Sequence, residues 1–437
     1  MKMTKVLVLM LAALFLCFSL ASCGKNDDTP TQSNKTITLN VYNWGEYISD
    51  GSMESLNVND AFEEYYYEKY GVRVNVNYTT YATNEDMYSK LKNSAVVYDI
   101  VIPSDYMIER MIAEDMLLKF NPEEEIENFK YIEDSFKTNN TYDPENCYSV
   151  PYTYGMMGII YNTNFVDPED YEKQSWDLLW NEKYKGKILQ YNNPRDAFAT
   201  AMYYAGIDIN STNPADWDSA LELLKAQKPL VQGYVNDEIF NKMTTASAAI
   251  APYYAGDYLT MAAQEEALEF YYPKEGVNYF VDAMCIPAKS ANPEIAKEYI
   301  NFMLSEEAAV ANALYIGYAS PNTLVKNNEG YRDEMGEKAI KILYDTEPSV
   351  VNASYNEQYG TTSYKNFTPE IQAHVNTLWE SLKTENSTEL WVHVTAGIIV
   401  TAVITLAVYT TAIKKIRSRD YRARDKQKRI ESQKKKS

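Results

Sequence analysis

Strand and helix patterns alternate over residues 37–102, and this alternation is the strongest constraint on the fold. Apolar and polar side chains alternate in the strand patterns, and Gly71 follows the first helix pattern as a natural helix end. Parallel strands need a crossover, so the order β-α-β-α-β predicts a parallel sheet with right-handed crossovers. The predicted strands are residues 37–42, 72–78 and 98–102, and the predicted helices are residues 53–70 and 83–91.

A second set of strand and helix patterns extends to residue 303, and 437 residues leave room for two α/β domains. Asn213 precedes Pro214, and Asn292 precedes Pro293, an order typical of a helix cap followed by the first helical residue. The predicted strands here are residues 158–162, 185–189, 248–252 and 279–287, and the predicted helices are residues 213–226 and a segment after residue 292.

Aromatic and acidic side chains follow the strands of the first set. Trp44, Glu46 and Tyr47 come directly after the first strand, Tyr81 follows the second, and residues 104–106 follow the third. In open α/β sheets, ligands bind outside the carboxyl ends of the strands. Ring faces attract cations and cover methylene groups, and a carboxylate pairs with an ammonium group. The pattern indicates a ligand that is a flexible hydrocarbon with positive charge.

Composition excludes several classes of function. The two histidines, His374 and His393, leave no basis for Ser-His-Asp or Cys-His catalysis and make a zinc site improbable. A formal net charge of −20 argues against nucleic acid as a partner of the main body. No phosphate-binding glycine loop, EF-hand or Cys-x-x-Cys motif is present, and we expect no cofactor and no metal. Nothing beyond abundant Asp and Glu points to catalysis, so we expect no enzyme activity, with a glycosidase that uses two carboxylates as the alternative. Cys147 and Cys285 could pair outside the cytoplasm, and the sequence leaves this open.

Residues 1–22 have the pattern of an export signal. Lys2 and Lys5 precede an apolar run, which ends in Leu-Ala-Ser before Cys23. This resembles the lipobox of bacterial lipoproteins and predicts lipidation of Cys23. An ordinary signal peptide with a chance cysteine is the alternative. Residues 23–36 read as a flexible tether.

Residues 390–413 contain no Asp, Glu, Lys or Arg and are long enough to cross a bilayer as a helix. Residues 414–437 follow with 12 Lys/Arg against 3 Asp/Glu. The positive-inside rule predicts a cytoplasmic tail at 414–437 and an extracytoplasmic body, attached to the bacterial cell membrane. The alternative for residues 390–413 is a buried core helix.

Several stretches between residues 37 and 322 are similar to the spermidine/putrescine-binding proteins of ABC importers. Each is weak alone, and their order and spacing together are specific. They include Val41-Tyr42-Asn43-Trp44-Gly45-Glu46-Tyr47, Tyr98-Asp99-Ile100-Val101-Ile102-Pro103-Ser104, Phe280-Val281-Asp282 and Ile316-Gly317-Tyr318-Ala319-Ser320-Pro321-Asn322. The resemblance implies a two-lobe, periplasmic-binding-protein-like α/β fold with two crossing hinge strands. It also implies that a polyamine is captured between the lobes and delivered to the permease subunits.

The resemblance implies a domain division and a ligand site. Lobe 1 would comprise residues 37–150 with part of 283–325, and lobe 2 residues 151–282 with part of 326–385. Six residues match the family's aromatic box: Trp44, Tyr47, Tyr106, Tyr254, Phe280 and Tyr318. The polar positions of the site are Ser104, Asp105, Asn193, Asp196 and Asp282.

Three departures from the family pattern bear on the ligand. Asn193 stands where spermidine binders tend to carry an aspartate, and Tyr254 and Phe280 stand where tryptophans are usual. Asp105 replaces an uncharged residue and could restore the charge lost at residue 193. A diamine is thereby slightly favoured over spermidine.

Alternatives remain open for the residues and for the ligand. Asp105 or Asp196 could cap a helix instead of binding ligand, and Asp282 could be a structural acid. The same two-lobe receptor could bind a sugar, an amino acid or ferric iron, since iron sites favour clustered Tyr and carboxylate oxygens.

Overall fold

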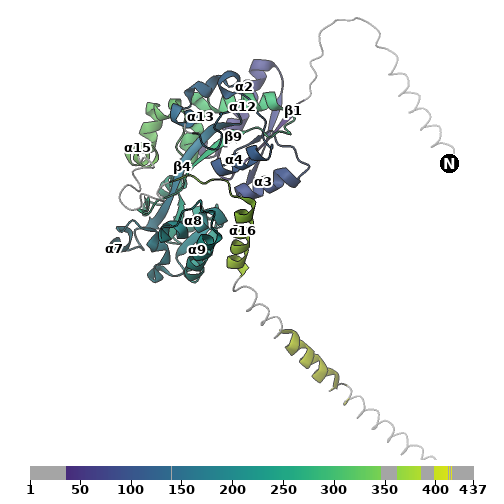
Figure 1. The fold of residues 1–437 in the computed structure, drawn as a ribbon, viewed down its shortest axis with the longest axis vertical. Helices are drawn as coiled ribbons and strands as arrows, with labels where there is room; N and C mark the ends of the chain where they lie inside the picture. The colour runs from purple at the N-terminus through teal and green to yellow at the C-terminus, as the bar shows by residue number, and fades with distance from the viewer. Residues whose placement is uncertain are drawn as a thin grey trace, which may run out of the picture.

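The computed structural model describes residues 36–138, 140–345, 362–384, 398–411, 413 and 415. Over this part of the chain, a mixed nine-stranded sheet runs through two lobes in the order β2-β1-β3-β9-β4-β7-β5-β6, with β8 paired to β4 (Figure 1). The strands are β1 (Ile37–Trp44), β2 (Val74–Tyr81), β3 (Ile100–Val101), β4 (Ser149–Asn162), β5 (Ile188–Tyr191), β6 (Val231–Val235), β7 (Ile250–Tyr254), β8 (Leu268–Tyr271) and β9 (Tyr279–Cys285).

Lobe 1 is built on the predicted β-α-β-α-β unit. Strand β1 pairs in parallel with both β2 and β3, which confirms the parallel sheet. Gly71 ends the first helix at φ 66°, and the Thr83 hydroxyl caps the second by accepting from the Asp86 backbone N–H at 3.1 Å. The helices of this lobe are α2 (Val58–Tyr70), α3 (Asn84–Asn93), α4 (Asp105–Ala113), α5 (Pro122–Glu125), α6 (Asp134–Thr138), α12 (Pro293–Met303) and α13 (Glu306–Ile316).

Two strands connect the lobes (Figure 1). The first half of β4 pairs antiparallel with β9, and its second half pairs with β7 and β8 of lobe 2. This confirms the two-lobe α/β fold. The predicted strand at 158–162 is only the end of β4. The register of β4 shifts between Pro151 and Thr153, and a residue without a backbone N–H is tolerated at such a shift. Because Pro151 interrupts the strand pattern in the sequence, the prediction missed the first half of β4.

Lobe 2 repeats the α/β layering. Strand β5 pairs in parallel with β6 and β7. Asn213 caps α9 by accepting from the Ala215 backbone N–H at 3.3 Å, as predicted. The helices here are α7 (Pro168–Tyr171), α8 (Pro194–Ala205), α9 (Pro214–Gln227), α10 (Glu238–Thr244), α11 (Ala255–Ala262) and α16 (Pro369–Thr384). Helices α14 (Thr323–Lys326) and α15 (Glu329–Tyr344) lie between α13 and α16 in the chain, and residues 398–411 are also helical.

Helix α12 begins at Pro293 as predicted, but Asn292 does not cap it. The Asn292 side chain makes no capping hydrogen bond, and its amide donates instead to the Thr38 backbone carbonyl at 3.1 Å. The residue therefore ties α12 to strand β1. Cys147 and Cys285 are both free thiols, with Cys285 buried.

The predicted terminal segments lie largely outside the described residues. Residues 1–35, which hold the predicted export signal and most of the tether, are not described, and neither are residues 385–397. Among the residues that the structure describes, including 398–411, no helix has both the length and the apolar character to cross a membrane. The predicted transmembrane helix is thus not supported.

Candidate functional site

A cleft of about 850 Å³, including its part open to solvent, lies between the two lobes. Loops after β1 and β3 line it from lobe 1, and the ends of β5 and β7 line it from lobe 2, while β9 forms its floor. This is the sheet edge at which the sequence predicted a ligand site. Ten of the eleven predicted ligand residues line the cleft: Trp44, Tyr47, Ser104, Tyr106, Asn193, Asp196, Tyr254, Phe280, Asp282 and Tyr318.

Asp282 on β9 is the acid at the centre of the cleft. Its side chain is buried, and its Oδ2 accepts from the Tyr47 hydroxyl at 2.6 Å. Burial raises the pKa of Asp282 to about 6, and the hydroxyls of Ser104 and Tyr47 oppose that shift. The other oxygen, Oδ1, finds no hydrogen-bond partner within the described chain. A buried carboxylate oxygen without a partner is costly, so this atom is suited to accept from a bound donor.

Asp196, in the first turn of α8, differs from Asp282 because its own neighbours satisfy both of its oxygens. Oδ2 accepts from the Tyr254 hydroxyl at 2.6 Å and from the Asn193 amide at 2.8 Å, and Oδ1 accepts from the Tyr364 hydroxyl at 2.8 Å. Burial raises its pKa, and the two tyrosine hydroxyls oppose that shift. The cap of α8 is Asn193, which accepts from the backbone N–H of Arg195. Asp196 therefore fixes two aromatic side chains in the cleft wall.

The aromatic residues form a continuous wall. The ring of Tyr47 lies 5.1 Å from that of Tyr318, and Phe280 lies 5.4 Å from Tyr254 and 6.1 Å from Tyr318, measured between ring centroids. Gly256 makes this packing possible, because a Cβ there would overlap the Tyr318 ring. Such a wall presents ring faces and edges to a ligand that passes Asp282.

Trp44 and Tyr106 bound the cleft from lobe 1. The Trp44 indole donates to the Ile102 carbonyl at 2.9 Å, which fixes the ring beside Tyr81. The Tyr106 ring lies 5.8 Å from that of Tyr364, a residue of the segment before α16. Sequence reasoning missed Tyr364, since no pattern before α16 marked it as a cleft residue.

Asp257 also lines the cleft, and sequence reasoning did not select it. It accepts from the Tyr318 hydroxyl at 2.8 Å, and burial raises its pKa to about 8, with Asp237 and Glu46 contributing repulsion. Asp237 of lobe 2 approaches Gly45 of lobe 1 so closely that a Cβ at 45 would overlap its carboxylate. Asp257 lies in the first turn of α11, three residues after a strand that ends in two tyrosines, and this position could have marked it as a candidate.

Arg195 places a fixed positive charge in the cleft. Its guanidinium lies 3.5 Å from the Phe367 ring centroid and 5.0 Å from that of Tyr106, and it donates to the Lys365 carbonyl at 2.9 Å. Because Arg195 adjoins Asp196, it offsets part of the negative charge there. Apart from Asp196, the acids of the cleft are therefore Asp282 and a group formed by Asp257, Glu46 and Asp237.

Asp105 is the predicted site residue that the structure does not bring into the cleft. It is the first residue of α4, after Ser104, and its side chain lines a second cavity on the other face of the hinge strands. The neighbouring residues Ser104 and Tyr106 do line the cleft. The side chain of Asp105 therefore lies on the opposite side of the hinge strands from those of Ser104 and Tyr106.

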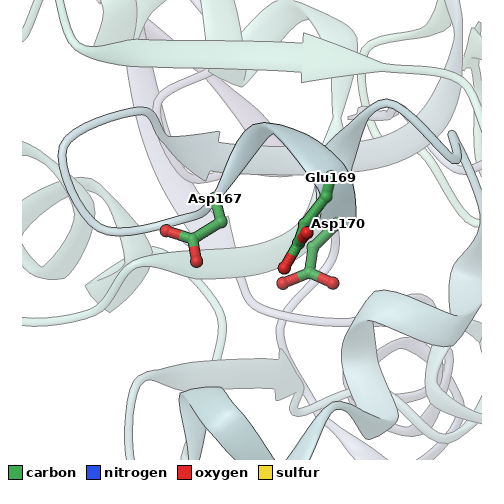
Figure 2. A group of neighbouring side chains, drawn as sticks. All are labelled: Asp167, Glu169 and Asp170. Atoms are coloured by element: carbon green, nitrogen blue, oxygen red, sulfur yellow. The ribbon is translucent and has the colours of Figure 1, made fainter.

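Three acids near α7 form the candidate metal cluster of the described residues, and Figure 2 shows Asp167, Glu169 and Asp170 gathered around the start of this short helix. Lys183 already contacts all three: it pairs with Asp167, lies 3.2 Å from an oxygen of Asp170 and 3.9 Å from one of Glu169. Because this ammonium already contacts all three carboxylates and offsets part of their charge, we assign no metal to the group.

The fold and the cleft define a class of protein, the two-lobe solute-binding receptors. Residues 58–336 match the family of bacterial extracellular solute-binding proteins. The chain is 33% identical over 311 residues to the spermidine/putrescine-binding periplasmic protein of Salmonella typhimurium, covering 71% of this chain and 82% of that protein. It is 30% identical over 339 residues to the Escherichia coli protein of the same name, covering 77% and 92%.

Solved structures agree. A putative spermidine/putrescine ABC transporter protein from Listeria monocytogenes superposes with a TM-score of 0.68 at 29% identity, covering 80% of this chain and 99% of that one. The protein belongs to the family of spermidine/putrescine-binding periplasmic proteins within the bacterial extracellular solute-binding proteins. It is a transport receptor and not an enzyme.

Proposed function

We propose that the protein binds a short aliphatic polyamine in the cleft, outside the cell, and delivers it to the permease of an ABC transporter. The observation that carries this proposal is the free Oδ1 of Asp282 within a wall of aromatic rings. An ammonium group would supply the missing donor, and the rings would cover the methylenes, each cation–π contact adding roughly 0.5–2 kcal/mol.

The charges in the cleft favour a diamine such as putrescine. Asp282 and Asp257 each offer a carboxylate, while Asp196 is engaged by its own partners and lies beside Arg195. Asn193 adds no charge, since its amide is bound to Asp196. Glu46 and Asp237 lie beside Asp257, so the available acids form two groups, one at Asp282 and one at Asp257, and a diamine would place one ammonium at each.

Isothermal titration with three ligands of similar length tests the proposal. Putrescine should bind, and 1,4-butanediol should not, because it has the same chain without charge. The third ligand, 4-aminobutanoate, replaces one ammonium with a carboxylate and tests the amino-acid alternative. The proposal fails if putrescine and spermidine give no binding heat at millimolar concentration, or if 1,4-butanediol binds as tightly as putrescine.

We also propose that the mature chain is anchored outside the cytoplasmic membrane through a lipidated Cys23. The small residues before Cys23 support the lipid anchor. Single acyl anchors hold weakly, so the apolar residues 390–413 could contribute a second attachment with the 414–437 tail in the cytoplasm. Alkaline extraction of membranes after a Cys23→Ala change separates the two: loss of the chain from the membrane fraction would leave Cys23 as the anchor.

A further inference from the structure

A second cavity, of about 1400 Å³ including its open part, lies behind the hinge strands. Side chains of β9 alternate between the two hollows: Phe280 and Asp282 line the cleft, and Tyr279 and Val281 line the second cavity. The two hollows therefore share one strand as a common wall. Nothing in the cleft function proposed above uses the second one.

Asp105 presents an unpartnered carboxylate oxygen in this cavity. The side chain is 2% exposed, and its Oδ1 accepts from the Tyr106 backbone N–H at 2.7 Å. Its Oδ2 finds no hydrogen-bond partner among the described residues. Burial raises the pKa of Asp105 to about 8, with repulsion from Asp282 adding to the shift and the backbone N–H groups of Tyr106 and Val281 opposing it. Oδ2 itself has no hydrogen-bond donor in the ionised form and no acceptor in the protonated form.

The surroundings of Asp105 are aromatic. Phe136, Tyr142, Tyr154 and Tyr272 also line the cavity. Among the described lining residues, Lys326 forms a salt bridge with Glu133 at 3.1 Å. Lys326 is therefore not the charge partner of Asp105. A buried carboxylate among ring faces is the combination that accepts an organic ammonium ion.

We propose that this cavity is a second binding site, for a small organic monocation of the alkylammonium class, with Asp105 as its charge partner. A cation there also relieves the repulsion between Asp105 and Asp282 across the shared wall. The inference does not depend on which ligand fills the cleft.

Titration of n-butylamine into the purified full-length protein tests the site, with Asp282→Asn as the background because this change removes the charge partner in the cleft. We expect n-butylamine to bind with a stoichiometry of one in this background. Adding Asp105→Asn should weaken that binding at least tenfold. Asp115→Asn, which removes an exposed acid two residues beyond the same helix, is the matched control and should change the Kd less than twofold.

A second variant keeps the test valid if Asp105→Asn does not fold. Ser135 is exposed and lines the cavity, so Ser135→Trp should block entry without altering the core, and it should also abolish n-butylamine binding. In the otherwise unchanged protein, both Asp105→Asn and Ser135→Trp should leave the putrescine Kd within about threefold, which separates this site from the cleft.

Three results would overturn the proposal. The first is the absence of n-butylamine binding at concentrations up to 50 mM, roughly the weakest Kd that we would assign to a specific site. The second is n-butylamine binding that survives both Asp105→Asn and Ser135→Trp. The third is equal binding of n-butanol, which would show that the cavity takes apolar chains without regard to charge.

Discussion

Two buried carboxylates in one cleft, Asp282 and Asp196, have different environments although the sequence predicted a ligand-binding role for both. Asp282 keeps one oxygen without a partner, whereas Asp196 receives hydroxyl and amide donors from Tyr254, Tyr364 and Asn193. Asp196 also adjoins the cation of Arg195. A matching residue type is therefore not sufficient for a role in ligand binding, because the donors around each acid decide whether it is available.

The comparison predicts that a change at Asp282 has the largest effect on putrescine affinity. Asp282→Asn keeps the shape of the side chain and the hydrogen bonds to Oδ2 but removes the charge that faces the ligand. Loss of one partner from a buried charge pair costs about 2–5 kcal/mol, so we expect the putrescine Kd to rise by at least about 100-fold in isothermal titration. Glu64→Gln on the exposed face of α2 is the control. A change of less than threefold for Asp282→Asn would contradict the account.

A change at Asp257 should have the second largest effect on putrescine affinity. Asp257 is less buried than Asp282, so solvent screens more of its attraction for a second ammonium. Asp257→Asn should raise the putrescine Kd by about tenfold and change n-butylamine binding in the cleft much less, since a monoamine has one charge to place. Equal losses for the two ligands would mean that Asp257 acts on the cleft as a whole and not on the second ammonium.

Asp196→Asn should have a smaller effect on affinity. Its hydroxyl donors remain able to bond to the amide oxygen, and the lost charge acts on the ligand only at a distance, which we expect to cost about fivefold in Kd. The same titration as for Asp282→Asn measures it. If Asp196→Asn weakens putrescine as strongly as Asp282→Asn does, the distinction between the two acids is wrong.

The pH dependence should separate Asp282 from Asp257. Both pKa values are raised, so protons compete with the ligand, and binding weakens as the pH falls. With Asp257→Asn, protonation of Asp282, whose pKa is about 6, should raise the putrescine Kd about fourfold between pH 7.5 and 5.5. The unchanged protein should show a steeper rise, because the Asp257 pKa of about 8 adds a second proton. Parallel pH profiles for the two proteins would remove Asp257 from the site.

Much of this arrangement could be predicted from the sequence. The alternation of strand and helix patterns gave the parallel sheet of lobe 1, and the position of Trp44 and Tyr47 after β1 placed them in the cleft. Hydrogen-bond satisfaction could not be predicted, because the partners of Asp196 come from residues 58 and 168 positions away. The side to which Asp105 points depends on the start of α4, where a shift of one residue exchanges the cleft for the second cavity.

A crystal structure of the protein with putrescine would examine the availability of Asp282 directly. Our account predicts an ammonium nitrogen within about 3.2 Å of Asp282 Oδ1, with the methylene chain against Phe280 and Tyr318. Putrescine bound in the cleft with both nitrogens on Asp196, and with Asp282 Oδ1 still without a donor, would contradict it.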